Sequence, residues 1–162
     1  MKKLSAIAIG ALLILFALSF MTPAKAEEDV NRAECIDRGE AALKLIKEIG
    51  NEAALNKIQY YDDDRRFHWD KGWVFVIEDE KATILAHPAF PGFVGQEFLN
   101  MKSDDGKLIF QEFIRIANTK GKGWIAYNWT SHDVSEKTNC YVLKVPDENL
   151  IVVSLLRQGP QE

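Results

Sequence analysis

The sequence has few cysteines and few histidines, with two of the former and three of the latter among 162 residues. The histidines do not recur at the short intervals of a metal-binding motif, so a structural zinc site is not expected. A Gly-x-Ser-x-Gly elbow, which would mark a hydrolase nucleophile, is missing, and so is a glycine-rich phosphate loop. These absences argue against an enzyme and against a resident cofactor or metal.

Positive charge is also in short supply. Twenty lysines and arginines stand against 24 acidic residues, which gives a formal net charge of −4. A nucleic-acid-binding domain needs a basic face, so no nucleic-acid partner is expected. The apolar fraction of 47% and the charged fraction of 27% are those of a globular protein. A chain of this length accommodates one compact domain rather than two.

Charged residues are absent from residues 4 to 24, where Leu, Ile, Ala and Phe dominate. Lys2 and Lys3 precede this run, and Ala24-Lys25-Ala26 places small residues where a signal peptidase cleaves. We therefore predict a signal peptide over residues 1–26, one domain over residues 27–162, and a periplasmic or secreted location. An uncleaved membrane anchor remains the alternative, because the apolar run nearly reaches the length that spans a bilayer.

Export would place Cys35 and Cys140 in an oxidising compartment, where cysteines tend to pair. We predict a disulfide between them. A cross-link that closes so long a loop would stabilise the protein by about 4–5 kcal/mol in the chain-entropy treatment. Two buried free thiols are the alternative.

The hydrophobic pattern predicts the element order helix, two strands, helical insertion and three strands. Apolar residues at helical spacing predict a long helix over residues 31 to about 57 and an amphipathic helix around residues 110–117, and a short helix is expected over residues 96–101. Alternating or β-branched runs predict strands over residues 73–77, 83–87, 124–129, 140–145 and 150–156. This order predicts an α+β fold with a five-stranded antiparallel sheet of the PAS-like kind.

Several blocks of sequence resemble the single Cache domain family of extracytoplasmic ligand-sensing modules. They match in order and spacing over about residues 30–156. The blocks are Gly72-Trp-Val-Phe-Val-Ile77, Ile84-Leu-Ala-His-Pro88, Gly95, Met101-Lys-Ser-Asp-Asp-Gly-Lys107, Gly121-Lys-Gly-Trp-Ile-Ala-Tyr-Asn-Trp129 and Lys137-Thr-Asn-Cys-Tyr-Val142. The resemblance implies a long N-terminal helix on one face of the sheet and a cover of helix and loop on the other.

The resemblance also implies a ligand pocket between the sheet and this cover. Alternation along the strands, arranged as such a pocket requires, predicts an aromatic wall with one imidazole and nearby lysines. Protonated His87 and the lysines would attract a carboxylate. The expected ligand-binding residues are Phe75, His87, Lys102, Tyr127, Trp129, Lys137 and Tyr141. With Tyr141 facing the pocket, Cys140 would face the N-terminal helix that carries Cys35.

Three functions follow from these patterns. The first is a periplasmic sensor for a small molecule, with a short carboxylate suggested by the family, which acts in signal transduction or chemotaxis through a separate membrane chemoreceptor or sensor kinase. The second is an envelope interaction module that kept the fold without a ligand, in which the aromatic wall is simply core. An enzyme is the third and least supported. A homodimer formed through the N-terminal helix is also left open.

Overall fold

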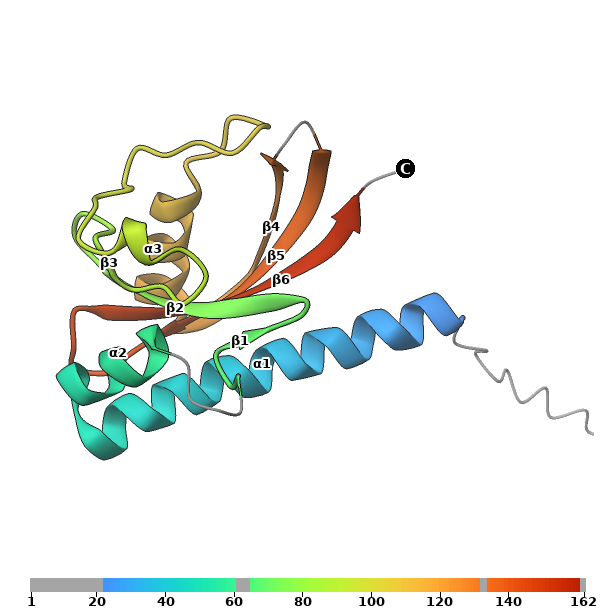
Figure 1. Ribbon diagram of the computed structural model, residues 1–162. Helices are drawn as coiled ribbons and strands as arrows, with labels where there is room; N and C mark the ends of the chain where they lie inside the picture. Colours follow the sequence, from blue (N-terminus) through green and yellow to red (C-terminus); the bar gives the residue numbers. More distant parts are fainter. Residues whose placement is uncertain (1–21, 61–64, 132–133, 161–162) are drawn as a thin grey trace, which may run out of the picture.

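The computed structural model describes residues 22–60, 65–131 and 134–160. An antiparallel sheet runs in the strand order β4-β5-β6-β2, and the short strands β1 and β3 both pair with β2 (Figure 1). Two helices lie on one face and a third helix on the other. The elements are α1 (Pro23–Ile49), α2 (Asn51–Gln59), β1 (His68–Trp69), β2 (Gly72–Glu78), β3 (Ile84–Ala86), a 3-10 helix (Pro91–Phe93), α3 (Ile109–Lys120), β4 (Lys122–Ser131), β5 (Val134–Lys144) and β6 (Leu150–Pro160). The predicted α+β fold with an antiparallel sheet is confirmed.

The first predicted helix is in fact two helices. Gly50 ends α1 with a φ of 81°, a conformation that glycine adopts without the steric cost of a side chain, and its N–H caps the Ile46 carbonyl at 3.0 Å. The chain then turns into α2. At its other end α1 begins earlier than predicted, at Pro23, where proline suits the first helical turn.

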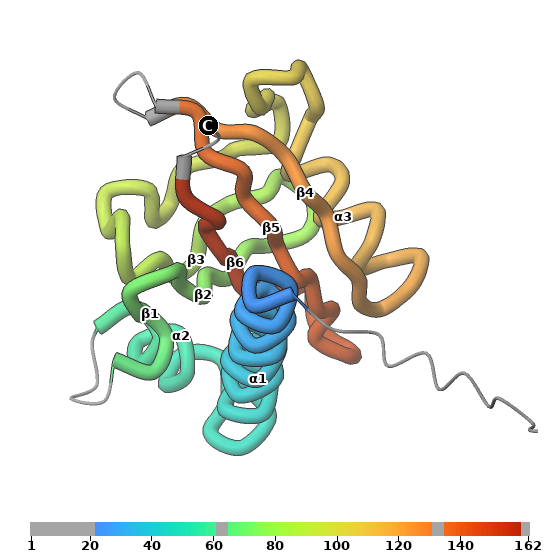
Figure 2. Tube along the Cα trace, turned by 90° about the vertical axis from the view of Figure 1, so that its right-hand side faces the viewer, coloured from blue at the N-terminus to red at the C-terminus, as the bar shows by residue number. Residues whose placement is uncertain are grey.

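The sheet separates two apolar cores. One lies between the sheet and helices α1 and α2, and Figure 2 shows α1 crossing this face. The other lies between the sheet and α3, where Phe113 and Ile116 are almost completely buried. Since strand side chains alternate, each strand residue belongs to one core or the other. We call these the helix face, covered by α1 and α2, and the cover face.

The cover consists of α3 and the segment 88–108 that precedes it. The short helix predicted over residues 96–101 is wrong. The backbone there pairs with β3 instead: Gly95 N–H donates to the Ile84 carbonyl at 2.8 Å, and Ile84 N–H donates to the Gln96 carbonyl at 3.0 Å. These bonds hold residues 95 and 96 against β3, and the rest of the segment 88–108 consists of turns and irregular backbone apart from the 3-10 helix at Pro91–Phe93.

Most of the predicted signal peptide, residues 1–21, lies outside the described residues. Residues 23–26 form the first turn of α1. Cleavage after Ala26 therefore stays a prediction. Among the helices of the described ranges, none combines the length and the apolar character that crossing a bilayer requires.

Candidate functional site

An aromatic cluster occupies the cover face beside strand β2. The ring of His87, which follows β3, stacks on Phe75 with centroids 5.2 Å apart and planes at 19°. Phe90 from the cover lies 5.2 Å from His87, and Trp73 lies 5.8 Å from it. Phe75 and His87, both predicted as site residues, are therefore brought together.

His87 is buried, with 5% of the residue exposed. Burial disfavours its charged form and lowers its pKa to about 4. Its Nδ1 accepts a hydrogen bond from the Phe90 N–H at 3.0 Å, which leaves Nε2 as the protonated nitrogen. The expected protonated His87 is thus wrong at neutral pH, because the ring is a neutral hydrogen-bond donor.

Tyr127 and Trp129 lie on the same face, on strand β4. Tyr127 is buried, and its hydroxyl lies 3.6 Å from the Cys140 sulfur. Burial raises the pKa of this hydroxyl well above its usual value. Thr138, also buried, stands opposite Tyr127 on β5. Trp129 is only partly buried and packs at the margin of this core.

Much of the predicted aromatic wall is packed in this structure. Phe75 is 3% exposed, and Phe110 and Phe113 of α3 lie 6.4 and 6.1 Å from it, measured between ring centroids. Side chains of α3 thus fill the centre of the cover face. The accessible part of the wall is its margin, where Trp73 and Trp129 remain partly exposed.

Arg157 is a cation at this margin that sequence reasoning missed. It lies two residues beyond Leu155 on β6, and Leu155 faces the cover. The Arg157 guanidinium carbon is 5.7 Å from the centroid of the Trp73 ring, and Nη2 donates to the Asp70 carbonyl at 3.2 Å. Within the described part of the chain, no carboxylate forms an ion pair with it. The alternation of Val153, Leu155 and Arg157 is the signal that could have found it.

The other predicted site residues lie elsewhere. Tyr141 is on the helix face, where its ring lies 5.1 Å from Trp124 and its hydroxyl 3.4 Å from Glu40 of α1. The prediction that Tyr141 shares a face with Tyr127 is therefore wrong. Lys137 stands opposite Asn128, one position away from the Tyr127–Thr138 pair, so alternation places it on the helix face as well. Lys102 is exposed in the cover, where it forms an isolated bridge with Leu108.

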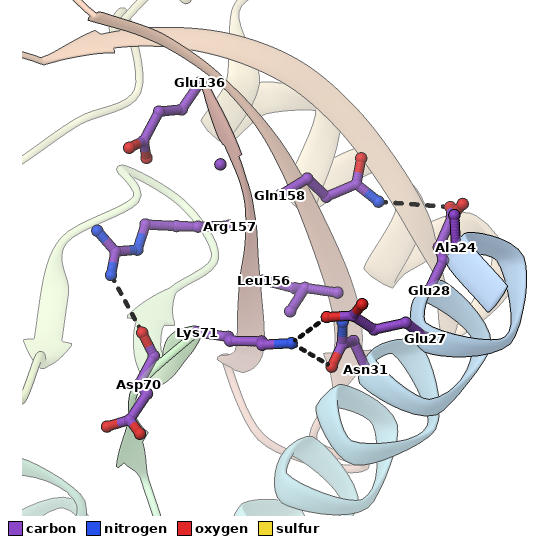
Figure 3. A pocket seen from close by; sticks show the side chains of 11 residues that line it. Ala24, Glu27, Glu28, Asn31, Asp70, Lys71, Glu136, Leu156, Arg157 and Gln158 are labelled. Atoms are coloured by element: carbon purple, nitrogen blue, oxygen red, sulfur yellow. Dashed lines mark hydrogen bonds and ion pairs between the residues drawn. The ribbon is translucent and has the colours of Figure 1, made fainter. Parts of the chain in front are cut away.

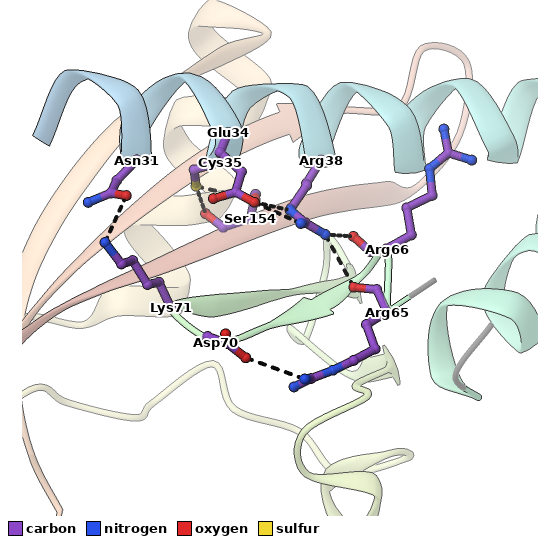
Figure 4. Close-up of polar contacts among 9 residues, drawn as sticks. All are labelled: Asn31, Glu34, Cys35, Arg38, Arg65, Arg66, Asp70, Lys71 and Ser154. Carbon is purple, nitrogen blue, oxygen red and sulfur yellow. Dashed lines mark hydrogen bonds and ion pairs between the residues drawn. The ribbon is translucent and has the colours of Figure 1, made fainter. Parts of the chain in front are cut away.

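The predicted disulfide is also wrong. Cys35 packs on the helix face, where its thiol lies 3.3 Å from both the carbonyl and the hydroxyl oxygen of Ser154 (Figure 4). Cys140 lies in the other core, next to Tyr127, so the sheet separates the two thiols. Both cysteines are free and buried. Burial raises the pKa of Cys35 to about 11 and that of Cys140 further, so neither is a reactive thiolate.

We expect a reducing agent to leave the melting temperature of the purified protein unchanged, because no cross-link exists to be broken. Thermal unfolding followed by circular dichroism, with and without reductant, measures this. Alkylation of the unreduced, denatured protein should label both Cys35 and Cys140. A marked fall in the melting temperature on reduction, as loss of about 4–5 kcal/mol would cause, would restore the disulfide.

A groove of about 590 Å³ opens at the edge of the sheet, where β2 begins at Gly72 and β6 continues past it (Figure 3). Arg157 and Gln158 point to opposite sides of β6 there, so the groove borders both faces. On the helix side Lys71 Nζ donates to Glu27 at 2.9 Å and to Asn31 at 3.1 Å, and Lys71 lowers the pKa of Glu27. The lining residues are Ala24, Glu27, Glu28, Asn31, Asp70, Lys71, Glu136, Leu156, Arg157, Gln158 and Gly159.

A long helix on one face of an antiparallel sheet, with a helix-and-loop cover on the other, is the arrangement of PAS-like sensor domains. The family profile described as Single Cache domain 2 matches residues 26–156 of this sequence, so the chain belongs to the single Cache domain family. Single Cache domains are extracytoplasmic sensor domains that bind ligands rather than catalyse reactions.

Known relatives agree with this assignment. The methyl-accepting chemotaxis protein McpP of Pseudomonas putida is 28% identical over 97 residues, which cover 60% of this chain and 17% of that protein. A periplasmic sensor domain of a chemotaxis protein superposes with a TM-score of 0.57 at 22% identity, covering 83% of this chain and 92% of the other. A Cache chemosensory domain described for its carboxylic acid recognition gives 0.55 at 22% identity, covering 84% and 95%.

A methyl-accepting chemotaxis protein from Vibrio parahaemolyticus gives a TM-score of 0.58 at 13% identity and covers 83% of this chain and 90% of the other. At these identities the solved structures establish the fold. The chain spans less than a fifth of the curated relative's length, so it corresponds to one part of that receptor.

Proposed function

We propose that the protein is a periplasmic sensor that binds a short carboxylate at the margin of the cover face and acts through a separate membrane receptor or kinase. The observation that carries the proposal is Arg157, whose guanidinium lies over Trp73 without a carboxylate partner among the described residues. The match to a family of sensor domains supports a ligand-binding role for the domain.

The chemistry at this margin suits a small anion. A guanidinium offers paired N–H donors that match the two oxygens of a carboxylate. The indole Nε1 of Trp73 is buried and has no hydrogen-bond partner among the described residues, which provides a further donor. Neutral His87 supplies an N–H without a charge, so Arg157 would provide the countercharge. Trp73 and Phe90, whose rings lie 5.5 Å apart, offer apolar surface for a short carbon chain.

A titration with acetate, propionate and pyruvate tests the proposal. A ligand that binds only the folded protein stabilises it by mass action and so raises its melting temperature. At a ligand concentration of 100 times the Kd, the free energy of unfolding increases by about 2.7 kcal/mol. We expect Arg157→Met to weaken binding at least tenfold, measured by calorimetry, because it removes the countercharge. Lys137→Met, which neutralises a lysine on the helix face, is the matched control and should bind normally. Equal loss in both variants would mean that Arg157 does not hold the ligand.

The interaction module is the second candidate function, and a specific observation favours it. Phe90, Phe93 and Val94 are 46%, 37% and 42% exposed and follow one another closely in the cover, while the centre of the cover face is already filled. Such an apolar patch is typical of a protein-binding surface. The same titration separates the two functions, because an interaction module would show no thermal shift with any of the acids.

A further inference from the structure

His87 joins three elements through three different contacts. Its backbone N–H donates to the side-chain oxygen of Gln59 in α2 at 2.6 Å. Its ring stacks on Phe75 of β2, and its Nδ1 accepts the hydrogen bond from Phe90 N–H at 3.0 Å. The last contact fastens the beginning of the cover, and it depends on the protonation state of the ring.

Only a neutral imidazole can accept the Phe90 N–H. A protonated ring carries hydrogens on both nitrogens, so an N–H group would face another N–H group and the bond would be lost. Protonation would also place a charge in a site that is 95% shielded from water, which is costly without a counterion. The arrangement in which Phe90 N–H bonds to His87, which we call the closed form, therefore favours the neutral imidazole.

The groups that face His87 offer no compensating negative charge. The α2 side contributes the neutral amide of Gln59, β2 contributes Trp73 and Phe75, and the cover contributes Phe90 and Phe93. The titratable group that acts on it is His68, whose own charge opposes that of His87. Arg157, beyond Trp73, is also a cation. Within the described ranges, no carboxylate forms a hydrogen bond or ion pair with the imidazole.

The segment that this bond fastens is held mainly by local bonds and ring contacts. We define the gate segment as residues 89–94. Its backbone bonds run from Phe93 N–H to the Phe90 carbonyl and from Val94 N–H to the Pro91 carbonyl, and the Gln96 side chain donates to the Gly92 carbonyl at 2.6 Å. The rings of Phe90 and Phe93 also contact Trp73 and Phe98, with centroids 5.5 and 5.2 Å apart. The next anchor to the sheet is Gly95, which bonds to Ile84. Exposed Phe90, Phe93 and Val94 show that burial of side chains adds only part of the restraint.

We propose that His87 is the latch of an acid-sensitive gate: protonation of its imidazole releases Phe90 and frees the gate segment from the cover face. The opening uncovers the aromatic margin beside Trp73. Its use in admitting or releasing a ligand rests on the proposed function, whereas the opening itself does not.

The pH range follows from linkage. Burial lowers the pKa of His87 to about 4 in the closed form, against about 6.5 for an exposed histidine. The preference for the closed form is complete above pH 6.5 and is lost progressively as the pH falls from 6.5 to 4. From these two values we expect the open fraction of the gate segment to rise about 20-fold between pH 7 and pH 5.

Hydrogen exchange of the full chain, read by mass spectrometry and corrected for the intrinsic pH dependence of exchange, tests the gate. We expect opening of the gate segment to increase about 20-fold from pH 7 to pH 5, while α3 amides change little. His87→Asn keeps an acceptor oxygen near the position of Nδ1 but does not titrate, so its gate segment should stay closed at both values. His87→Phe keeps a ring without an acceptor, so its gate segment should be open at both.

His68→Gln is the matched control for the neighbouring histidine and should retain the pH response. A pH-independent gate segment in the native protein would overturn the proposal, and so would an undiminished pH response in His87→Asn. The pKa of His87, followed by nuclear magnetic resonance, should lie well below 6.5. These readouts need no ligand, so an intact gate with no binding in the carboxylate titration would contradict the proposed function alone.

Discussion

Gly72→Ala is expected to destabilise the protein by about 3 kcal/mol or more, which would lower the melting temperature by roughly 10 °C or prevent folding. A Cβ at Gly72 would lie 1.9 Å from the Leu155 carbonyl oxygen and 2.8 Å from Cζ2 of Trp69. The first contact is with the backbone of β6, a central strand paired with both β2 and β5. Relief of the clash would require β2 and β6 to separate. Thermal and urea unfolding followed by circular dichroism measure the loss.

Gly92→Ala is the control for this substitution. A Cβ at Gly92 meets no atom within 4 Å, and its backbone does not adopt a positive φ. We expect the free energy of unfolding to change by no more than about 0.5 kcal/mol. Similar losses in the two variants would show that the crowding at Gly72 is not what constrains that position.

Phe113→Ala is the second substitution with a large expected effect, a loss of about 3–5 kcal/mol in the free energy of unfolding. Phe113 is 1% exposed, and its ring lies 5.3 Å from Phe110 and 6.1 Å from Phe75, between centroids. Phe113 is the largest fully buried side chain of α3, so alanine would leave a cavity that these neighbours can fill only in part. Urea unfolding measures the loss.

Two variants calibrate the result. Phe113→Leu retains much of the side-chain volume, so we expect a smaller loss of about 1–2 kcal/mol. Arg115→Ala lies on the same helix and removes an exposed ion pair with Glu112, which is worth no more than about 1 kcal/mol. If Phe113→Ala were no more harmful than Arg115→Ala, α3 would not be packed on the sheet as described.

The hydrophobic pattern was sufficient to locate α3 and every strand of the described residues except β1, but not the relation between neighbouring strands. The two strands were predicted over residues 124–129 and 140–145, whereas β4 continues to Ser131 and β5 begins at Val134. The register of their pairing places Trp124, rather than Tyr127, on the same face as Tyr141. Since a shift of one residue moves every side chain to the opposite face, the positions of Tyr141 and Cys140 could not be obtained from either strand alone.

The end of strand β6 explains why the sequence did not predict Arg157 as a site residue. The last strand was predicted to stop at residue 156, but β6 continues to Pro160, so Arg157 was never placed on the cover face. Arg157 follows the alternation of Val153 and Leu155, but as a charged residue it does not itself extend the apolar pattern that marks a strand. The neutral state of His87 could not be predicted from the sequence either. It depends on burial by Phe90 and Phe93, which lie in a segment without a periodic pattern.

Gly39 lets helix α1 lie close to the sheet, because an added Cβ there would lie 3.1 Å from Leu143 Cδ1 and 3.2 Å from Ser154 Cβ. Cys35, one turn nearer the N-terminus, is also fully buried against the sheet. From Cys35 to Pro23 the helix is a stiff rod of about 18 Å, at 1.5 Å per residue. The groove beside β6 borders this part of the helix, where Lys71 is bonded to Glu27 and Asn31. A tilt of about 5° at Cys35 would move the first turn of α1 by about 1.6 Å, so a change that leaves the packed middle of the helix in place would be felt mainly at its beginning.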